Sequence, residues 1–233
     1  APLLLLFDID GTLLLNGADA HAAAVVAALC EVWEVEPPQR AHGVEAAGRT
    51  DQAIARDILE LAGIAPEQFD QRRDDFIVAA ASHYERLVPD DLSDRLAPNA
   101  AETIAEVHAH ERYHCSLVTG NIQPVARLKL GAAGILYPFT EGQGGFGSDS
   151  DDRNELPPIA RLRAGQLWNG GDAWPAEKTV VIGDTPRDIA CARADGTLVV
   201  AVATGPFAAD DLADADVVIE DLRQLDAALE SLS

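Results

Sequence analysis

Short apolar runs bounded by polar residues recur along this chain of 233 residues. Continuous runs of this length are typical of strands buried on both faces. We expect strands at five places: Leu3–Phe7, His114–Thr119, Thr179–Ile182, Thr197–Ala203 and Val217–Ile219. Those after the first alternate with helical periodicity over Ala100–Glu111, Val125–Ala133, Pro158–Leu167, Arg187–Ala194 and Leu222–Leu232. This alternation predicts βαβ units, and therefore a doubly wound α/β fold with a parallel sheet.

One interval interrupts the alternation. Between the first strand and Leu96, about 80 residues carry helical patterns and no clear strand pattern. The helical stretches are Ala18–Val32, Asp51–Ala62, Pro66–Phe69 and Gln71–Leu87. This interval is too long for a crossover connection and indicates an inserted helical domain. We therefore predict an α/β core from residues 1–15 and 96–233, and a helical domain from residues 16–95. The glycine-rich stretch Glu141–Arg153 is expected to be a loop.

The charge balance limits the partners. The chain has 39 acidic and 17 basic residues, a formal net charge of −22. It should repel nucleic acid and anionic membranes, so we expect neither as a partner. No run approaches the roughly 18 apolar residues that span a bilayer, and the leading leucines lack the basic flank of a targeting segment. We expect a cytoplasmic protein, monomer or homodimer.

Polar residues that could take part in catalysis or ligand binding follow three of the predicted strands. Asp8 and Asp10 end the first run, and because unpaired charge is costly inside a buried strand, they should lie at its carboxyl end, where open α/β sheets bind ligands. The second and third groups are Thr119-Gly120-Asn121, and Gly183-Asp184 with Asp188 four residues later. A threonine hydroxyl beside the free amides of a helix start is suited to an anion.

Convergence of these carboxylates would require a cation. Carboxylates within ~4 Å of each other repel by about 4 kcal/mol per pair at an effective dielectric near 20. A divalent ion removes this penalty. Since the sequence offers hard oxygen ligands and no histidine or cysteine cluster with metal-ligand spacing, Mg²⁺ is the favoured ion.

The order of these motifs resembles that of the haloacid dehalogenase (HAD) superfamily. Asp8-x-Asp10-Gly-Thr, Thr119-Gly-Asn, a later basic residue and Gly183-Asp184-x-x-x-Asp188 are similar to its motifs one to four. The helical insertion resembles the small cap domain of phosphoglycolate-phosphatase-like and β-phosphoglucomutase-like members. The resemblance implies a Mg²⁺-dependent hydrolase of a small phosphorylated metabolite, of the phosphoglycolate or sugar phosphate type, that works through an aspartyl phosphate.

The resemblance also implies residue roles. Asp8 would be the nucleophile and Asp10 the general acid/base. The metal would be held by Asp8, the backbone carbonyl of Asp10, and Asp184, with Asp188 supporting the site. Thr119 and the Gly120 amide would bind phosphate oxygens, with Asn121 in the same binding loop.

Two basic residues complete the predicted site. Arg153 is expected at the basic position of motif three, with Arg161, Arg163 and Lys178 as the competing residues. Arg49, just before a predicted helix of the insertion, would contact the leaving group of the substrate. The alternative is that Arg49 is simply exposed, beside a helix N-cap formed by its neighbours.

Related chemistries are separated by single residues. Asp10 disfavours dehalogenation, in which the resemblance places an aromatic residue there, and transport ATPases of the group, which carry lysine there. A Schiff-base mechanism with a cap lysine fails, since residues 1–128 contain no lysine. Two alternatives to a phosphatase stay open: a phosphosugar mutase, and a non-catalytic protein that binds a phosphorylated metabolite or regulates a partner.

Overall fold

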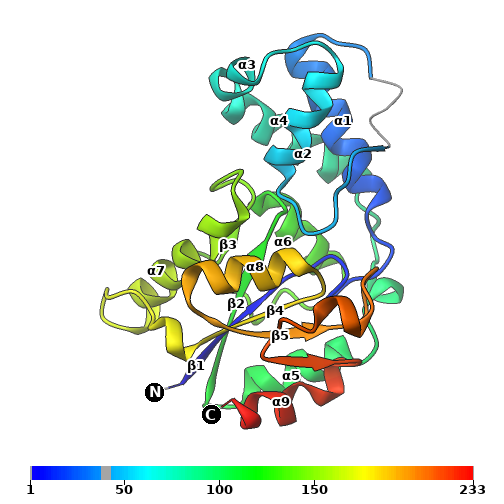
Figure 1. Ribbon diagram of the computed structural model, residues 1–233. Coiled ribbons are helices and arrows are strands. Elements are labelled where there is room, and N and C mark those ends of the chain that lie inside the picture. Colours follow the sequence, from blue (N-terminus) through cyan, green and yellow to red (C-terminus); the bar gives the residue numbers. More distant parts are fainter. Residues whose placement is uncertain (1, 38–42, 233) are drawn as a thin grey trace.

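Six parallel strands form the central sheet of the computed structural model, which describes residues 2–37 and 43–232 (Figure 1). Their order across the sheet is β3-β2-β1-β4-β5-β6, and each neighbouring pair is parallel. The strands are β1 (Leu3–Phe7), β2 (Tyr113–Thr119), β3 (Gly145–Phe146), β4 (Thr179–Gly183), β5 (Leu198–Val202) and β6 (Val217–Ile219). The predicted doubly wound α/β fold is confirmed.

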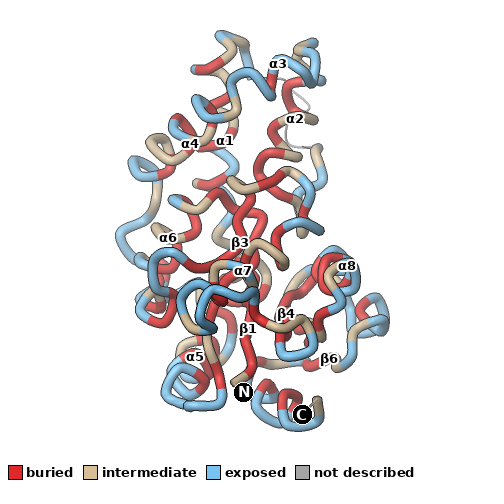
Figure 2. Tube along the Cα trace, turned by 90° about the vertical axis from the view of Figure 1, so that its left-hand side faces the viewer, coloured by how far each residue is buried: buried red, intermediate tan, exposed pale blue. Residues whose placement is uncertain are grey.

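Helices cover both faces of the sheet, and the side chains of β1 show how. Leu3, Leu5 and Phe7 pack into one hydrophobic cluster, whereas Leu4 and Leu6 pack into another. The first cluster takes in α5 (Ala100–Ala109), α6 (Gln123–Ala132) and α9 (Leu225–Ser231), and the second takes in α7 (Leu156–Trp168) and α8 (Pro186–Asp195). Figure 2 shows the resulting buried trace through the strands. Burial on both faces explains why these strands are continuous apolar runs.

Strand β3 was not expected from the sequence. Its two residues lie inside the stretch Glu141–Arg153, which was predicted to be a loop. Gly145 of β3 approaches α7 so closely that a Cβ would lie 2.2 Å from the Leu156 carbonyl oxygen. A two-residue strand that uses glycine for this contact has no apolar pattern, so the prediction of a loop was wrong here for lack of a sequence signal.

Four of the described α-helices between β1 and β2, those that precede α5, form what we call the helical insertion. They are α1 (Asp19–Trp33), α2 (Asp51–Leu61), α3 (Pro66–Gln71) and α4 (Arg73–Leu87), and Figure 1 shows them grouped apart from the sheet. They share a hydrophobic cluster in which the Trp33 and Phe69 rings stack 5.7 Å apart. Ile122 and Val125, the residues at the start of α6, extend the cluster into the sheet domain. None of the described helices is long and apolar enough to cross a membrane.

Backbone hydrogen bonds fix the helical insertion to the sheet domain. The two connecting segments pair with each other: the Leu15 amide donates to the Arg95 carbonyl at 2.7 Å, and the Ala97 amide donates to the Leu13 carbonyl at 2.9 Å. At the start of α2, the Asp51 amide donates to the Gly120 carbonyl at 2.8 Å. The insertion is therefore seated directly on the loop that follows β2.

Candidate active site

The register of the sheet brings three chain segments together. Phe7 at the end of β1 lies opposite Leu117 of β2 on one side and Ile182 of β4 on the other. Asp8, the next residue, donates its amide hydrogen to the Ile182 carbonyl at 2.9 Å. Asp8 consequently lies between the carboxyl ends of β2 and β4. Thr119 is the last residue of β2, and Asp184 directly follows β4.

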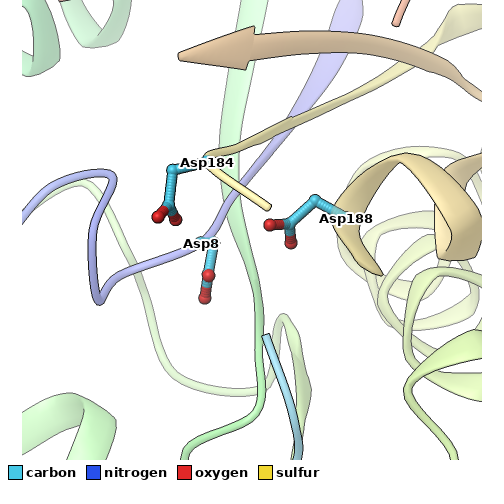
Figure 3. A group of neighbouring side chains, drawn as sticks. All are labelled: Asp8, Asp184 and Asp188. Atoms are coloured by element: carbon cyan, nitrogen blue, oxygen red, sulfur yellow. The ribbon is translucent and has the colours of Figure 1, made fainter. Parts of the chain in front are cut away.

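Asp8, Asp184 and Asp188 form a buried acidic cluster. One carboxylate oxygen from each lies within 4.8 Å of the others, and all three residues are at most 4% exposed. Figure 3 shows the three side chains as neighbours: Asp8 and Asp184 extend in the same direction from the ends of β1 and β4, and Asp188 points toward them from the start of α8. The structure thus brings together Asp8 and Asp184, which follow two of the predicted strands, with Asp188 of α8.

Gly11 and Thr12 explain why the first motif continues as Gly-Thr. Gly11 has a φ of +88°, and a Cβ there would lie 2.1 Å from Asp184 Oδ2. A side chain at this position would collide with the acidic cluster as well as strain the backbone. The Thr12 hydroxyl donates to Asp184 Oδ1 at 3.0 Å and so orients that carboxylate.

Asp188 is held by the first turn of α8. The Thr185 amide and hydroxyl donate to Asp188 Oδ2 at 3.0 and 2.7 Å, and the Asp188 amide in turn donates to the Thr185 hydroxyl. This reciprocal capping box fixes the helix start and the carboxylate together. The second carboxylate oxygen, Oδ1, accepts a hydrogen bond from Arg153.

Arg153 is the basic residue that the structure brings to the cluster. Its Nη2 lies 3.2 Å from Asp8 Oδ2 and also contacts Asp188, while its buried Nε has no hydrogen-bond partner among the described residues. The three competing residues lie elsewhere: Arg161 pairs with Asp195, Arg163 pairs with Asp149, and Lys178 is exposed. A guanidinium that is held in place beside Asp8 is suited to a phosphate oxygen.

Burial makes the cluster reluctant to ionise without a further cation. Desolvation raises the pKa of Asp8 to about 7; Arg153 opposes this, and the charges of Asp188 and Asp10 add to it. Desolvation also raises the pKa of Asp184 to about 8, with Asp8 and Asp188 as the next causes. One guanidinium therefore does not compensate three buried carboxylates.

The donor set fits a magnesium ion. All three groups are hard oxygen ligands, and the raised pKa values of Asp8 and Asp184 are those of carboxylates that lack a counter-charge. The Asp10 carboxylate is not part of this group, so its predicted contribution to the metal rests on its backbone carbonyl alone.

The carboxylate of Asp10 instead binds a lysine. Lys129 Nζ lies 2.7 Å from both Asp10 oxygens, and Asn121 Nδ2 donates to Oδ2 at 2.7 Å. Desolvation by itself would raise the pKa of Asp10, but the charge of Lys129 and the hydrogen bonds from Lys129 and Asn121 lower it below its ordinary value. The side chain of Asp10 remains 34% exposed. Asp10 thus presents to the cleft an ionised carboxylate that Lys129 and Asn121 hold in place.

Lys129 was missed as a functional residue in the sequence analysis. It is only 1% exposed and lies on α6, four residues after Val125 and three after Ala126, both buried. A lysine at helical spacing from the apolar face is the signal that could have identified it, because a buried ammonium needs a charged partner. The identity of that partner is a long-range property of the fold.

The loop after β2 supplies the predicted phosphate-binding groups. Thr119 Oγ1 accepts hydrogen bonds from Asn121 N (3.3 Å) and Nδ2 (3.0 Å), which leaves its own proton for another acceptor. Gly120 has no room for a side chain, since a Cβ would lie 1.9 Å from the Arg49 carbonyl oxygen. Asn121 is shared between Thr119 and Asp10.

Arg49 lies at the cleft but is held within the helical insertion. Its Nη1 pairs with Asp57 at 2.6 Å, and its Nη2 donates to the Ala53 carbonyl at 3.2 Å. Thr50 provides the N-cap of α2, with its hydroxyl accepting from the Ala53 amide. The predicted N-cap is therefore present at Thr50, but Arg49 beside it is not simply exposed: its side chain is 19% exposed, paired with Asp57, and part of the cleft lining.

A cleft of about 330 Å³ connects these groups. Its walls come from the sheet domain, with Asp8, Asp10, Gly120, Asn121, Arg153 and Asp184, and from the helical insertion, with His21, Arg49, Asp51 and Ile54. A cleft of this size suits a small ligand. Seven of the predicted site residues line this cavity, namely Asp8, Asp10, Arg49, Gly120, Asn121, Arg153 and Asp184, whereas Thr119 and Asp188 are buried behind it.

The parallel sheet and the acidic cluster at its carboxyl edge define an α/β enzyme with a carboxylate-based active site. A family profile described as haloacid dehalogenase-like hydrolase matches residues 5–193, and the chain belongs to this family. A search of curated protein sequences finds no match.

Solved structures share the fold over nearly the whole chain. CbbY from Rhodobacter sphaeroides, in complex with phosphate, has a TM-score of 0.64 at 17% identity, covering 97% of this chain and 96% of its own. A predicted phosphoglycolate phosphatase from Haemophilus somnus has 0.61 at 20% identity, covering 98% of each chain. β-Phosphoglucomutase from Clostridium difficile has 0.62 at 15% identity, covering 100% of this chain and 97% of its own.

Proposed function

We propose that the protein is a Mg²⁺-dependent hydrolase of small phosphorylated metabolites and that Asp8 forms an aspartyl phosphate. The observation that carries the proposal is the position of Arg153, 3.2 Å from Asp8 at the edge of the acidic cluster, with a buried Nε that has no partner among the described residues. The complex of CbbY with phosphate and the phosphoglycolate phosphatase among the structural relatives support this reaction class.

The first step transfers the phosphoryl group to Asp8. A carboxylate oxygen of Asp8 forms a bond to phosphorus while the bond from phosphorus to the leaving oxygen breaks. Arg153, the Thr119 hydroxyl and the Gly120 amide would hold the non-bridging oxygens and so fix the line of attack. Covalent catalysis of this kind divides one difficult displacement into two easier ones.

Asp10 would serve both steps as the proton carrier. It would give a proton to the leaving oxygen in the first step, and take one from the water that attacks the aspartyl phosphate in the second. The lowered pKa of Asp10 suits the second step directly. In the first step the proton of a singly protonated phosphate monoester, whose second pKa is near 6, would pass through the Asp10 carboxylate to the leaving oxygen, so that Asp10 is ionised again for the second step.

Asp8, Asp184 and the Asp10 carbonyl would hold Mg²⁺, with Asp188 supporting the site. When bound, this ion neutralises the acidic cluster and withdraws charge from the phosphoryl group. Without such compensation the buried carboxylates would repel an anionic substrate.

The helical insertion would act as a cap that restricts the leaving group. We propose residues 16–95 as this cap domain and residues 1–15 and 96–233 as the core. The small volume of the cleft and its location between the two parts support a compact substrate such as phosphoglycolate or a sugar phosphate. Arg49 would be the cap residue nearest the leaving group, provided that it exchanges Asp57 for the substrate.

The charges of the cleft favour hydrolysis over mutase chemistry. A mutase must bind a sugar with two phosphates, whereas the arginines among the described cleft residues are only Arg49 and Arg153. Arg153 serves Asp8, and Arg49 is paired with Asp57. No other guanidinium or ammonium group of the described lining is placed to hold a second phosphate.

Hydrolysis of a panel of phosphomonoesters, with and without Mg²⁺, tests the proposal. Phosphoglycolate, sugar monophosphates and p-nitrophenyl phosphate would be compared, and Asp8→Asn would be the inactive control. We expect Mg²⁺-dependent release of phosphate by the wild-type protein alone. Folded wild-type protein that binds these esters with Mg²⁺ but never releases phosphate would instead favour a binding protein.

A further inference from the structure

The buried ammonium of Lys129 is connected to the helical insertion as well as to Asp10. Its Nζ lies 3.1 Å from His21 Nδ1, on α1, and His21 Nε2 lies 2.9 Å from Asp51 Oδ2, at the start of α2. The same Asp51 oxygen accepts the Ile122 amide hydrogen at 2.8 Å. A continuous chain of hydrogen bonds therefore runs from the loop after β2, through the insertion, to Asp10.

The protonation of His21 follows from its two partners. An ammonium can only donate hydrogen bonds, so Nδ1 facing Lys129 must be the acceptor. The proton then lies on Nε2, which donates to the Asp51 carboxylate. In this tautomer each contact pairs a donor with an acceptor, and Asp51 fixes the ring in the orientation that Lys129 needs.

The cost of burying charged side chains indicates that this chain of hydrogen bonds has a role beyond packing. Lys129 is 1% exposed, His21 9% and Asp51 3%, and hydrophobic residues at such positions would avoid the desolvation of two charges. The group that gains from the arrangement is Asp10, whose carboxylate receives both of the close contacts from Nζ. The opposite side of Asp10 is open to the cleft.

We propose that Lys129 is a positioning residue for Asp10, and that His21 and Asp51 of the helical insertion position Lys129. This inference rests on the proposed function, since it concerns the proton transfer assigned to Asp10. When the insertion is seated, the ammonium fixes the carboxylate at one place on the cleft wall. Seating the insertion on the sheet domain and orienting the proton carrier are then one event.

The variant Lys129→Met removes the ammonium and keeps most of the buried volume. The chain contains one other lysine, the exposed Lys178, so Lys178→Met is the matched control. With p-nitrophenyl phosphate and Mg²⁺, the leaving group needs no proton, whereas hydrolysis of the aspartyl phosphate still requires Asp10. Stopped-flow release of nitrophenolate separates the two steps.

For Lys129→Met we expect a burst of nitrophenolate close to one per active site, followed by turnover about 100-fold slower than wild type, because misplacing a catalytic group by ~1 Å costs on this order. Because only the second step is slowed, kcat/KM should stay close to that of wild type, and KM should fall together with kcat. Lys178→Met should match wild type. A structural role alone would lower the amount of folded protein or the burst itself, and would leave the turnover of the folded fraction unchanged.

Two histidine variants test the second half of the proposal, even if Lys129→Met does not fold. His21→Leu removes the acceptor and should give the same burst with turnover about 10-fold slower, since Lys129 keeps its contacts with Asp10. His21→Gln retains an acceptor and should recover part of that loss.

The outcomes separate this inference from the proposed function. A folded Lys129→Met or His21→Leu protein whose turnover stays within about threefold of wild type would overturn the inference while the phosphatase activity stands. Slow turnover without a burst would also overturn it, because the first step would then be the one that depends on Lys129. Absence of Mg²⁺-dependent turnover in the wild type would overturn both proposals.

Discussion

The guanidinium of Arg153 lies between Asp8 and Asp188, with Nη2 3.2 Å from Asp8 Oδ2 and in hydrogen-bond contact with Asp188 Oδ1. Arg153 comes from the short 3₁₀ turn Arg153–Glu155 just before α7, whereas Asp8 follows β1 and Asp188 lies in the first turn of α8. One side chain thus links three segments of the sheet domain and supplies the positive charge closest to the proposed nucleophile.

Replacing Arg153 with methionine should therefore affect stability and activity together. Breaking a buried ion pair by removing one partner costs about 3–5 kcal/mol. We expect the free energy of unfolding of the metal-free protein to fall by about 3 kcal/mol in urea titrations, and phosphatase activity to be lost. Arg161→Met is the matched control, since Arg161 forms a bidentate pair with Asp195 away from the cleft. Equal activities of the two variants would count against the role of Arg153.

The acidic cluster predicts how stability depends on pH in the absence of metal. Asp8 and Asp184 have a pKa of about 7 and about 8 in the folded protein, against the ordinary value of 3.8. Between about pH 4 and pH 8 the folded state therefore binds more protons than the unfolded state. The contribution of these two groups to the free energy of unfolding consequently falls as pH rises. We expect the thermal midpoint in EDTA to fall over this window.

Comparison with Asp184→Asn separates the cluster from the net charge of −22, which also destabilises the protein at high pH. The variant keeps the other surface charges, so its midpoint should fall less steeply than that of wild type. Saturating Mg²⁺ should flatten the wild-type profile, since metal binding requires the ionised ligands and strengthens as pH rises. Parallel profiles for the two proteins in EDTA would contradict the assignment.

Gly120 predicts how closely the helical insertion must approach the sheet domain. A Cβ on Gly120 would lie 1.9 Å from the Arg49 carbonyl oxygen, so Gly120→Ala must push α2 away from the loop after β2. We expect kcat to fall at least 10-fold and amide hydrogen exchange at the start of α2 to become faster. Gly131→Ala is the control, because a Cβ there would meet its nearest atom at 3.8 Å. It should be neutral or stabilise helix α6 by up to about 1 kcal/mol.

If the Asp51 backbone amide of Gly120→Ala exchanged its hydrogen as slowly as that of the control, the insertion would not be seated through this contact. The measurement is informative because the Asp51 amide donates directly to the Gly120 carbonyl, and Gln52 Nε2 donates to the Gly147 carbonyl at 2.7 Å. Both bonds should weaken together when α2 is displaced.

The parallel sheet and its acidic cluster could be predicted because their signals are local. A strand buried on both faces requires a continuous apolar run, and parallel strands bring their carboxyl ends to one edge. Asp8 and Asp184 each follow such a run directly, so their meeting required no knowledge of the packing of helices. The helices of the insertion were equally predictable from the sequence. The observed bounds of α2 and α4 agree with the predicted ones to within two residues.

The environment of Asp10 could not be predicted in the same way. Lys129 on α6 and His21 on α1 are separated by 108 positions and meet only because the insertion packs on the start of α6. Arg153 was expected on the family resemblance, but the spacing of residues alone left Arg161 and Arg163 as competitors, because the choice depends on which residues of the α7 region face β1. Such contacts depend on tertiary packing, for which the spacing of residues in the sequence gives no measure.

The central claim is that Asp8 carries the phosphoryl group during turnover, and trapping that species tests it most directly. Wild-type protein would be mixed with substrate and Mg²⁺, quenched in acid within the first turnover, digested and analysed by mass spectrometry, with Asp8→Asn and Lys178→Met treated alongside. We predict phosphate on the peptide that contains Asp8 in wild type and Lys178→Met, and none in Asp8→Asn. Phosphate release by the wild type with no phosphorylated peptide, or with the phosphate on another residue, would contradict the account.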